Sequence, residues 1–399
     1  MQISLKKFLI TGLALSLILS MNTVYYDEID SSVPKYLILS GVISFSIVLT
    51  LVSIYHMIQT GTKLKGLLIF YLAYTLLSVL LMYFSTLNGG FGGKNLITLI
   101  IFPLLIAPSV YWGKANHSIA FFKSYESLVI LLSYLSLAGW LLAMIGVSTN
   151  MTRQISWGTD YSVNGYFNLH FLSQNSVSFL GLSVIRNTGL FVEAPMYSFV
   201  LSVALLSHLF ITKTDKWADF NLLILGVTIL TTTSTTGVLV LVLAVFLRLA
   251  LSLNGLKKFL LIGLAPVALF VVALVIQAKM QSMSGSVNIR LNDFYVGFQA
   301  WKERPFFGHS ILDTSSIKNY MDVERTIIGG NDGFSSGFME MLVAGGGFFA
   351  CFWGIVPFWK YGLQSVKNAM FACLLFVLLL VTIIDKTFLF MYLLVFMVL

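Results

Sequence analysis

The sequence predicts an all-α, polytopic integral membrane protein with about twelve transmembrane helices, organised as a single membrane domain over residues 1–399. Hydrophobic residues make up 58% of the chain and charged residues only 10%, whereas soluble domains carry about 25% charged residues. The mean hydropathy is +0.90. The net charge of +8 is scattered over the ends of apolar stretches. Composition therefore excludes a soluble domain, and the scattered charge predicts no nucleic-acid partner.

Apolar stretches long enough to cross a bilayer, about 20 residues each, recur along the chain. The first follows Lys6 and Lys7 like a signal peptide, but it continues to Tyr26 and many others follow, which predicts an uncleaved signal-anchor helix. The predicted spans are 8–26, 36–58, 66–87, 96–112, 127–149, 194–212, 218–234, 236–250, 259–277, 337–358, 368–384 and 387–399.

The spans at 218–234 and 236–250 are short and could instead form one long tilted helix. Basic residues precede the pair at Lys213 and Lys216, and a second group lies at its end and beyond, at Arg248, Lys257 and Lys258. One long helix would place one of these groups outside, against the positive-inside bias. We therefore predict a hairpin that turns near Thr235–Gly237.

The distribution of basic residues predicts that both termini are cytoplasmic. The short outer loops then carry Lys35, Lys94, Arg153, Arg186 and Lys386. The inner loops and span ends carry Lys6, Lys7, Lys63, Lys65, Lys114, Lys123, Lys213, Lys216, Arg248, Lys257, Lys258, Lys360 and Lys367.

Two outer loops are unusually long, at 150–193 and 278–336. In the first, the mostly apolar stretch SVSFLGLSVI (176–185) is too short to cross and predicts an interfacial or re-entrant piece. The aromatic residues ahead of it fit either an aromatic belt at the headgroup level or a surface that contacts substrate. These are Trp157, Tyr161, Tyr166, Phe167 and Phe171.

The predicted spans contain few ionisable groups, and no matched pair of broken spans appears in the two halves, which disfavours a coupled transporter. Cys351 and Cys373 lie in apolar segments and match no metal-ligand spacing, so we expect buried, free thiols and no metal or other cofactor. Chemistry, if the protein performs any, is expected in the outer loops.

The segment IRNTGLFVEAP (185–195) places Arg186 and Glu193 just ahead of a span. An arginine offers a fixed fork of donors that suits two phosphate oxygens. Alternatively, Arg186 and Glu193 simply pair with each other at the membrane surface.

The segment TTTSTTG (231–237) lies at the predicted outer turn of the hairpin. Its hydroxyl groups could satisfy carbonyl groups freed by a tight turn or donate to an anionic headgroup. The structural role is favoured.

The loop 278–336 concentrates charged and aromatic residues. Residues 292–302 predict a helix with an apolar side that ends ahead of Pro305. His309 titrates near neutrality and could act as a base, although a lone histidine is more often structural. Asp332 lies in a glycine-rich stretch that fits a binding turn or a flexible linker. The other polar and aromatic candidates are Arg290, Phe294, Tyr295, Trp301 and Arg304.

Four motifs occur in a fixed order: Arg-x-Thr-Gly-Leu-Phe before a span, a Thr/Ser turn ending in Gly, an Arg followed by an aromatic and a Pro-x-x-Gly element, and the glycine-rich helix GFMEMLVAGGGFF. In this order, over about residues 185–355, the chain resembles the O-antigen ligase and Wzy-type O-antigen polymerase superfamily. The resemblance implies a GT-C-like, metal-independent glycosyltransferase of the bacterial cytoplasmic (inner) membrane. Its donor would be a glycan linked through diphosphate to undecaprenol, and Arg186 and Arg290 would take the places of the family's diphosphate-holding arginines.

One departure from the family pattern bears on the reaction. Ligases of the family carry a histidine at the entrance to the span at 337–358, and this chain has Ser335–Ser336 there. Asp332, His309 and Glu193, in that order, are the substitutes for the missing base. The departure favours a polymerase over a ligase.

The sequence therefore predicts polymerisation of lipid-linked repeat units into O-antigen or capsular polysaccharide. Two alternatives stay open: a ligase that transfers finished glycan to lipid A core or protein, and a non-enzymatic flippase or transporter. A chain-length regulator and a flippase are candidate partner proteins, beside membrane lipid. The predicted glycan-binding residues are Glu193, Tyr295, Trp301 and Arg304.

Overall fold

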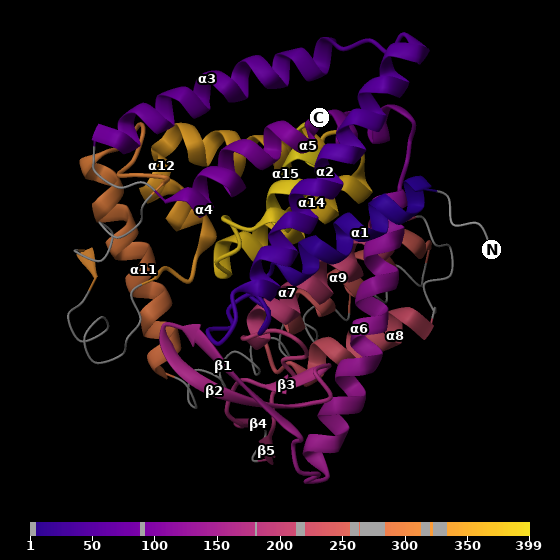
Figure 1. Ribbon diagram of the computed structural model, residues 1–399, viewed down its shortest axis with the longest axis vertical. Coiled ribbons are helices and arrows are strands. Elements are labelled where there is room, and N and C mark those ends of the chain that lie inside the picture. The colour runs from indigo at the N-terminus through magenta and orange to yellow at the C-terminus, as the bar shows by residue number, and fades with distance from the viewer. Residues whose placement is uncertain are drawn as a thin grey trace.

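The computed structural model describes residues 5–87, 92–179, 182–212, 220–255, 263, 284–312, 320–321 and 333–399. Most of these residues are helical (Figure 1). The helices are α1 (Leu5–Leu19), α2 (Val33–Thr60), α3 (Lys65–Leu87), α4 (Gly93–Leu96), the π-helical turn η1 (Ile97–Ile101), α5 (Phe102–Ala115), α6 (Ala120–Met144), α7 (Ala194–Phe210), α8 (Phe220–Thr231), α9 (Thr235–Ser252), α11 (Ser284–Glu303), α12 (Gly337–Gly354), α13 (Val356–Gly362), α14 (Val366–Val381) and α15 (Phe388–Val398).

In the part of the chain that the structure describes, six helices are long and apolar enough to cross a membrane. They are Val33–Thr60, Lys65–Leu87, Gly93–Ala115, Ala120–Met144, Thr235–Ser252 and Gly337–Gly362. Shorter apolar helices also lie at Ala194–Phe210, Phe220–Thr231, Val366–Val381 and Phe388–Val398. The mostly helical membrane fold is as predicted. The number twelve stays a prediction, and the predicted span 259–277 falls outside the described residues.

The helices differ in what surrounds them. On α3, Leu68, Leu72 and Leu76 recur every fourth residue and are all exposed, so they form one apolar face suited to lipid. By contrast, nearly every residue of α7 is buried, which is typical of a helix at the centre of a bundle. Cys351 and Cys373 are free thiols, but both are exposed, so the prediction that they are buried is wrong.

The predicted hairpin between α8 and α9 is present, but its turn comes before the predicted Thr235–Gly237, because α9 already begins at Thr235. The chain turns at 232–234, where Thr231 Oγ1 donates to Thr228 O at 2.8 Å and Thr232 Oγ1 to Ile229 O at 2.7 Å. Gly237 then lets α9 approach α7, because a Cβ atom there would overlap the hydroxyl of Ser198. The hydroxyl groups of this segment thus have the structural role that the sequence favoured.

The loop 150–193 departs from the all-α prediction. It contains the antiparallel sheet β1 (Met151–Trp157), β2 (Thr159–Tyr166) and β3 (His170–Leu172), and the hairpin β4 (Val177–Phe179) and β5 (Leu182–Val184). The stretch SVSFLGLSVI therefore forms a two-stranded hairpin. In β1, more exposed and more buried side chains alternate, and Gly158, with φ 73°, supplies the tight turn to β2. These strands gather at one end of the helices (Figure 1).

The loop that joins α1 to α2 makes backbone hydrogen bonds to two other segments at this end of the molecule. On one side Val24 N donates to Leu190 O at 2.9 Å and Val192 N to Asn22 O at 3.0 Å. On the other side Ile29 N donates to Gln154 O at 3.0 Å. The α1–α2 loop therefore lies between the segment ahead of α7 and strand β1, and it fixes both.

Candidate functional site

Charged side chains from several segments meet at the end of the helices where the strands lie. We call the following eight residues the outer cluster: Asp27, Lys35, Lys94, Arg186, Glu193, Glu340, Asp385 and Lys386. Electrostatic interactions link them in one chain, from Arg186 to Glu193, to Asp27, to Lys94 and on to Glu340. Lys94 is exposed, whereas Glu340 and Asp385 are buried. The cluster is thus both deep and accessible, as a binding site requires.

Two lysines of the outer cluster converge on one ring of the α1–α2 loop. The Nζ atoms of Lys35 and Lys94 lie 5.5 and 5.2 Å from the centre of the Tyr26 ring. Within the described ranges neither lysine has a carboxylate oxygen within 4.0 Å. Their positive charges are therefore available to an anion.

Arg186 is held by the turn between α8 and α9. Its Nε donates to Thr233 Oγ1 at 3.1 Å and lies 3.4 Å from Thr232 O. The next residue, Asn187, donates from its backbone N to Thr231 O at 3.0 Å. Among the described residues, the two Nη groups of Arg186 have no hydrogen-bond partner, so they can donate to a ligand.

The alternative that Arg186 pairs directly with Glu193 is wrong. No ion pair joins them within 4.0 Å; instead Glu193 Oε1 accepts a hydrogen bond from Trp157 Nε1 at 2.6 Å. Burial raises the pKa of Glu193, whereas the bond from Trp157 and the charge of Arg186 lower it. Burial lowers the pKa of Arg186 from its ordinary value, and Glu193 acts in the opposite direction. An arginine stays charged in a protein in any case.

The first turn of α12 forms the other side of the outer cluster. Glu340 makes an ion pair with Lys386. Burial, with a smaller contribution from Glu340, raises the pKa of Asp385 well above its usual range, although Lys386 opposes this. This side of the outer cluster therefore holds its charged groups close together in a buried place.

The predicted residues on α11 are accessible where the structure describes them. Tyr295 and Arg304 are exposed, and Trp301 is half-buried with its Nε1 donating to Pro305 O at 2.9 Å. Arg290 lies on α11, but its side chain is outside the described residues, as is the whole of Asp332. The helix ends at Glu303, ahead of Pro305, as predicted.

The contacts of His309 hold two helices together. Its ring is buried, and Nε2 lies 2.9 Å from the carbonyl oxygen of Ala300 in α11. Its backbone N donates to Val343 O of α12 at 2.9 Å. His309 thus joins α11 to α12, and its role as a base stays a prediction.

Ser335 and Ser336 occupy the place of the family histidine and have structural contacts. Ser335 N donates to Asp293 Oδ2 at 2.8 Å, and Ser336 caps α12 by accepting from Met339 N at 3.3 Å. Capping satisfies a free N–H group of the first turn. These contacts fix the start of α12 against α11.

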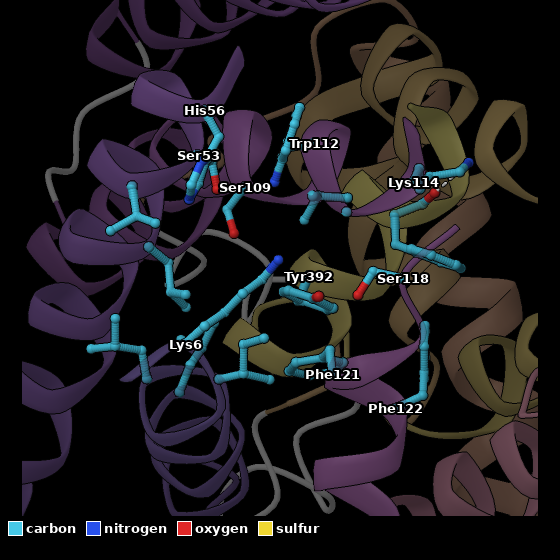
Figure 2. A pocket seen from close by; sticks show the side chains of 18 of the residues that line it. Lys6, Ser53, His56, Ser109, Trp112, Lys114, Ser118, Phe121, Phe122 and Tyr392 are labelled. Carbon is cyan, nitrogen blue, oxygen red and sulfur yellow. Dashed lines mark hydrogen bonds between the residues drawn. The ribbon is translucent and has the colours of Figure 1, made fainter. Parts of the chain in front are cut away.

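A separate cavity of about 90 Å³ lies among α1, α2, α5, α6 and α15. Figure 2 shows the ammonium group of Lys6 reaching into it near Tyr392, while that of Lys114 points away. Lys114 Nζ donates to Phe396 O at 2.9 Å. The cavity lies at the start of α1, roughly 20 Å along that helix from the α1–α2 loop. It is at the predicted cytoplasmic end and is distinct from the outer cluster.

Arg186 and Glu193 were predicted from the sequence as site residues, and in the structure both belong to the outer cluster. The other six members of the outer cluster were not predicted as site residues. They are Asp27, Lys35, Lys94, Glu340, Asp385 and Lys386. Three of these are basic residues of short outer loops, which is unusual where the positive-inside bias holds. In the described part of the chain, no group of three or more His, Cys, Asp or Glu side chains is arranged to hold a metal ion.

Comparison with protein families gives one match. A family model described as O-antigen ligase matches residues 220–354, from the start of α8 to the end of α12. No curated protein matches the chain. The matched region includes the α8–α9 turn, Arg290, His309 and Asp332, whereas Asp27, Arg186 and Glu193 precede it.

Proposed function

We propose that this chain, which carries a domain of the O-antigen ligase family at residues 220–354, polymerises glycan repeat units that are linked through diphosphate to undecaprenol. The reaction takes place on the outer face of the bacterial cytoplasmic membrane and yields O-antigen or capsular polysaccharide. One observation carries the proposal: Arg186, Lys35 and Lys94 lie beside the family domain with no carboxylate within 4.0 Å in the described residues. Such groups suit a diphosphate, which carries negative charge and needs several donors.

In the proposed reaction a hydroxyl group of one repeat attacks the anomeric carbon of the other glycan. The bond from that carbon to the diphosphate oxygen breaks, and undecaprenyl diphosphate leaves with the electron pair. Arg186 and Arg290 hold the diphosphate, and Lys35 and Lys94 add positive charge. Preorganised donors act most strongly on charge that develops during the reaction. A single displacement inverts the configuration at the anomeric carbon.

The remaining roles follow from position and chemistry. Tyr295, exposed on α11, and Trp301, half-buried, suit stacking against sugar rings. Arg304 can donate hydrogen bonds to sugar hydroxyl groups, and Glu193 can accept hydrogen bonds from them. Asp332, His309 and Glu193 are the candidates from the sequence for the proton acceptor.

The contacts of Ser335 and Ser336 support a polymerase over a ligase. Both serines are engaged in fixing the start of α12, so neither stands in for the ligase histidine. A deletion strain separates the functions through its surface polysaccharide. We expect single repeats attached at the cell surface, whereas polymer left on the carrier would indicate a ligase, and single repeats trapped inside a flippase.

Replacing Arg290 with alanine should abolish chain extension and leave the amount of protein unchanged. Arg290→Lys should recover little, because an ammonium group cannot reproduce the bidentate fork of arginine. The measurement is polymer length after reconstitution with a defined lipid-linked repeat. Lys302→Ala, an exposed position on the same helix, is the matched control and should extend chains normally. Normal extension by Arg290→Ala would remove Arg290 from the site.

A further inference from the structure

Asp27 is the carboxylate at the centre of the outer cluster. Its backbone is fixed on both sides, because Asp27 N donates to Thr23 O at 3.1 Å and Asp27 O accepts from Ser156 N at 3.0 Å. The neighbouring residue Glu28 is anchored by an ion pair with Arg153. The backbone of Asp27 is therefore held in place, which limits the positions that its side chain can reach.

The carboxylate of Asp27 lacks the bonds that a purely structural carboxylate would have. Its Oδ2 is buried and has no hydrogen-bond partner among the described residues. Buried polar atoms are nearly always paired, so an unpaired one needs an explanation. The residue as a whole is only half-buried. The protein therefore leaves one buried oxygen of this carboxylate without a donor, on a residue that still has exposed surface.

Charged and titratable groups of several neighbouring elements interact with Asp27. Lys94 of α4 and Lys35 of α2 attract its negative charge, and Glu193, just ahead of α7, repels it. Tyr161 of β2 also interacts with it. Burial raises the pKa of Asp27 to about 6, with Glu193 adding to the rise and the two lysines opposing it. A base is most effective when its pKa lies near the working pH.

The other candidates for the proton acceptor are less suited. Glu193 Oε1 already accepts a bond from Trp157, and His309 Nε2 is used against Ala300. Neither side chain is placed between two unpaired lysines. Asp27 interacts electrostatically with both Lys35 and Lys94, and these lysines can hold the leaving diphosphate.

We propose that Asp27 is the general base of the transfer, an inference that rests on the proposed function. As the oxygen of the acceptor hydroxyl bonds to the anomeric carbon, its proton passes to the Asp27 carboxylate. The bond between the anomeric carbon and the diphosphate oxygen breaks, and its electron pair leaves on the diphosphate beside Lys35 and Lys94. Solvent then takes the proton from Asp27, which restores the base.

Asp27→Asn tests this role in the full-length protein reconstituted with a defined lipid-linked repeat. The amide keeps the size of the side chain but cannot accept the proton, so we expect chain extension to fall by about 100-fold or more. Binding of the lipid-linked repeat should persist, because the lysines and Arg186 are unchanged. In the wild-type protein, extension should rise with pH through about 6, as Asp27 loses its proton. The residual activity of Asp27→Asn should lack this rise.

Asp30→Asn is the matched control, since Asp30 is exposed in the same loop; it should extend chains like the wild type. If Asp27→Asn is not recovered as folded protein, Asp27→Glu replaces it, and its extension should rise with pH about a different midpoint. Extension by Asp27→Asn within tenfold of wild type, or an unaltered pH profile in either variant, overturns the role of Asp27. Failure of the wild-type protein to extend chains would instead overturn the proposed function.

Discussion

Replacing Arg186 with lysine is expected to lower chain extension by about 100-fold, the usual loss when one preorganised donor to developing charge is removed. The reason lies in how the guanidinium group is held. Its Nε is fixed by Thr233 Oγ1 and Thr232 O of the α8–α9 turn, and both Nη groups are without a hydrogen-bond partner among the described residues. A lysine keeps the charge but loses both the anchor and the two-pronged contact.

The comparison is made by reconstituting each variant with the same lipid-linked repeat and measuring polymer length and repeat consumption. Arg153→Lys is the matched control. Arg153 is another arginine of an outer loop, but it pairs with Glu28, and a lysine can keep that pair, so extension should stay within twofold of wild type. If Arg186→Lys also stays within threefold, Arg186 does not hold the diphosphate through its fork.

Many helices of this protein were readable from hydropathy, because six of the described ones are long and apolar enough to cross a membrane and several shorter ones are apolar throughout. The α8–α9 hairpin was predicted because its two flanking basic groups could not both be inside otherwise. The end of α11 ahead of Pro305 followed from the restriction that proline places on the residue before it. These features depend on short stretches of sequence, so no knowledge of tertiary contacts was needed.

The sheets of the 150–193 loop were missed because hydropathy counts apolar residues and ignores their order. In β1 the apolar residues Ile155 and Trp157, two positions apart, and the glycine at 158 indicate the end of a strand and a turn. The stretch SVSFLGLSVI contains a glycine between two β-prone halves, which is typical of a hairpin. A search for period-two patterns in the outer loops would have found both.

The outer cluster could be predicted only in part. Lys35, Lys94, Arg186 and Lys386 lie in predicted outer loops of a chain whose basic residues otherwise lie mostly at predicted inner ends. Keeping positive charge there against the usual bias is itself a sign of function. That they meet, however, depends on hydrogen bonds such as Val24 N to Leu190 O. These contacts join residues far apart in the chain, and no local pattern reveals them.

Asp27 was missed for the same reason. A short polar loop between two spans is usually solvated, and its sequence does not show whether it is covered. Burial of Asp27 comes from β1 on one side and the segment ahead of α7 on the other. Only the folded arrangement turns an ordinary loop aspartate into a candidate base.

Replacing Gly346 with alanine is expected to disrupt the protein more than any other single-methyl change on α12. The helix breaks at this residue, which has φ 68° and ψ −170°. That backbone region is essentially restricted to glycine, and forcing another residue into it costs about 1–3 kcal/mol. A Cβ atom would also lie 2.6 Å from Gly308 N and overlap the carbonyl of Phe306.

The break in α12 matters because the chain at 305–309 fills it. Gly347 N donates to Pro305 O at 2.7 Å, Phe348 N to Phe306 O at 3.2 Å, and His309 N to Val343 O at 2.9 Å. These bonds replace those that an unbroken helix would have made, as backbone groups away from water require. They also fix the end of α11, and so the helix that carries Arg290, against α12.

Gly346→Ala should therefore lower the melting temperature in detergent and abolish chain extension together. Gly333→Ala is the matched control, because a Cβ atom there meets nothing within 4 Å, and it should change neither property. The two readouts separate structure from chemistry: Arg290→Ala should lose extension at an unchanged melting temperature. A Gly346→Ala protein with normal melting and normal extension would mean that the break in α12 does not position α11. The position of Arg290 at the diphosphate would then have to depend on other contacts of α11.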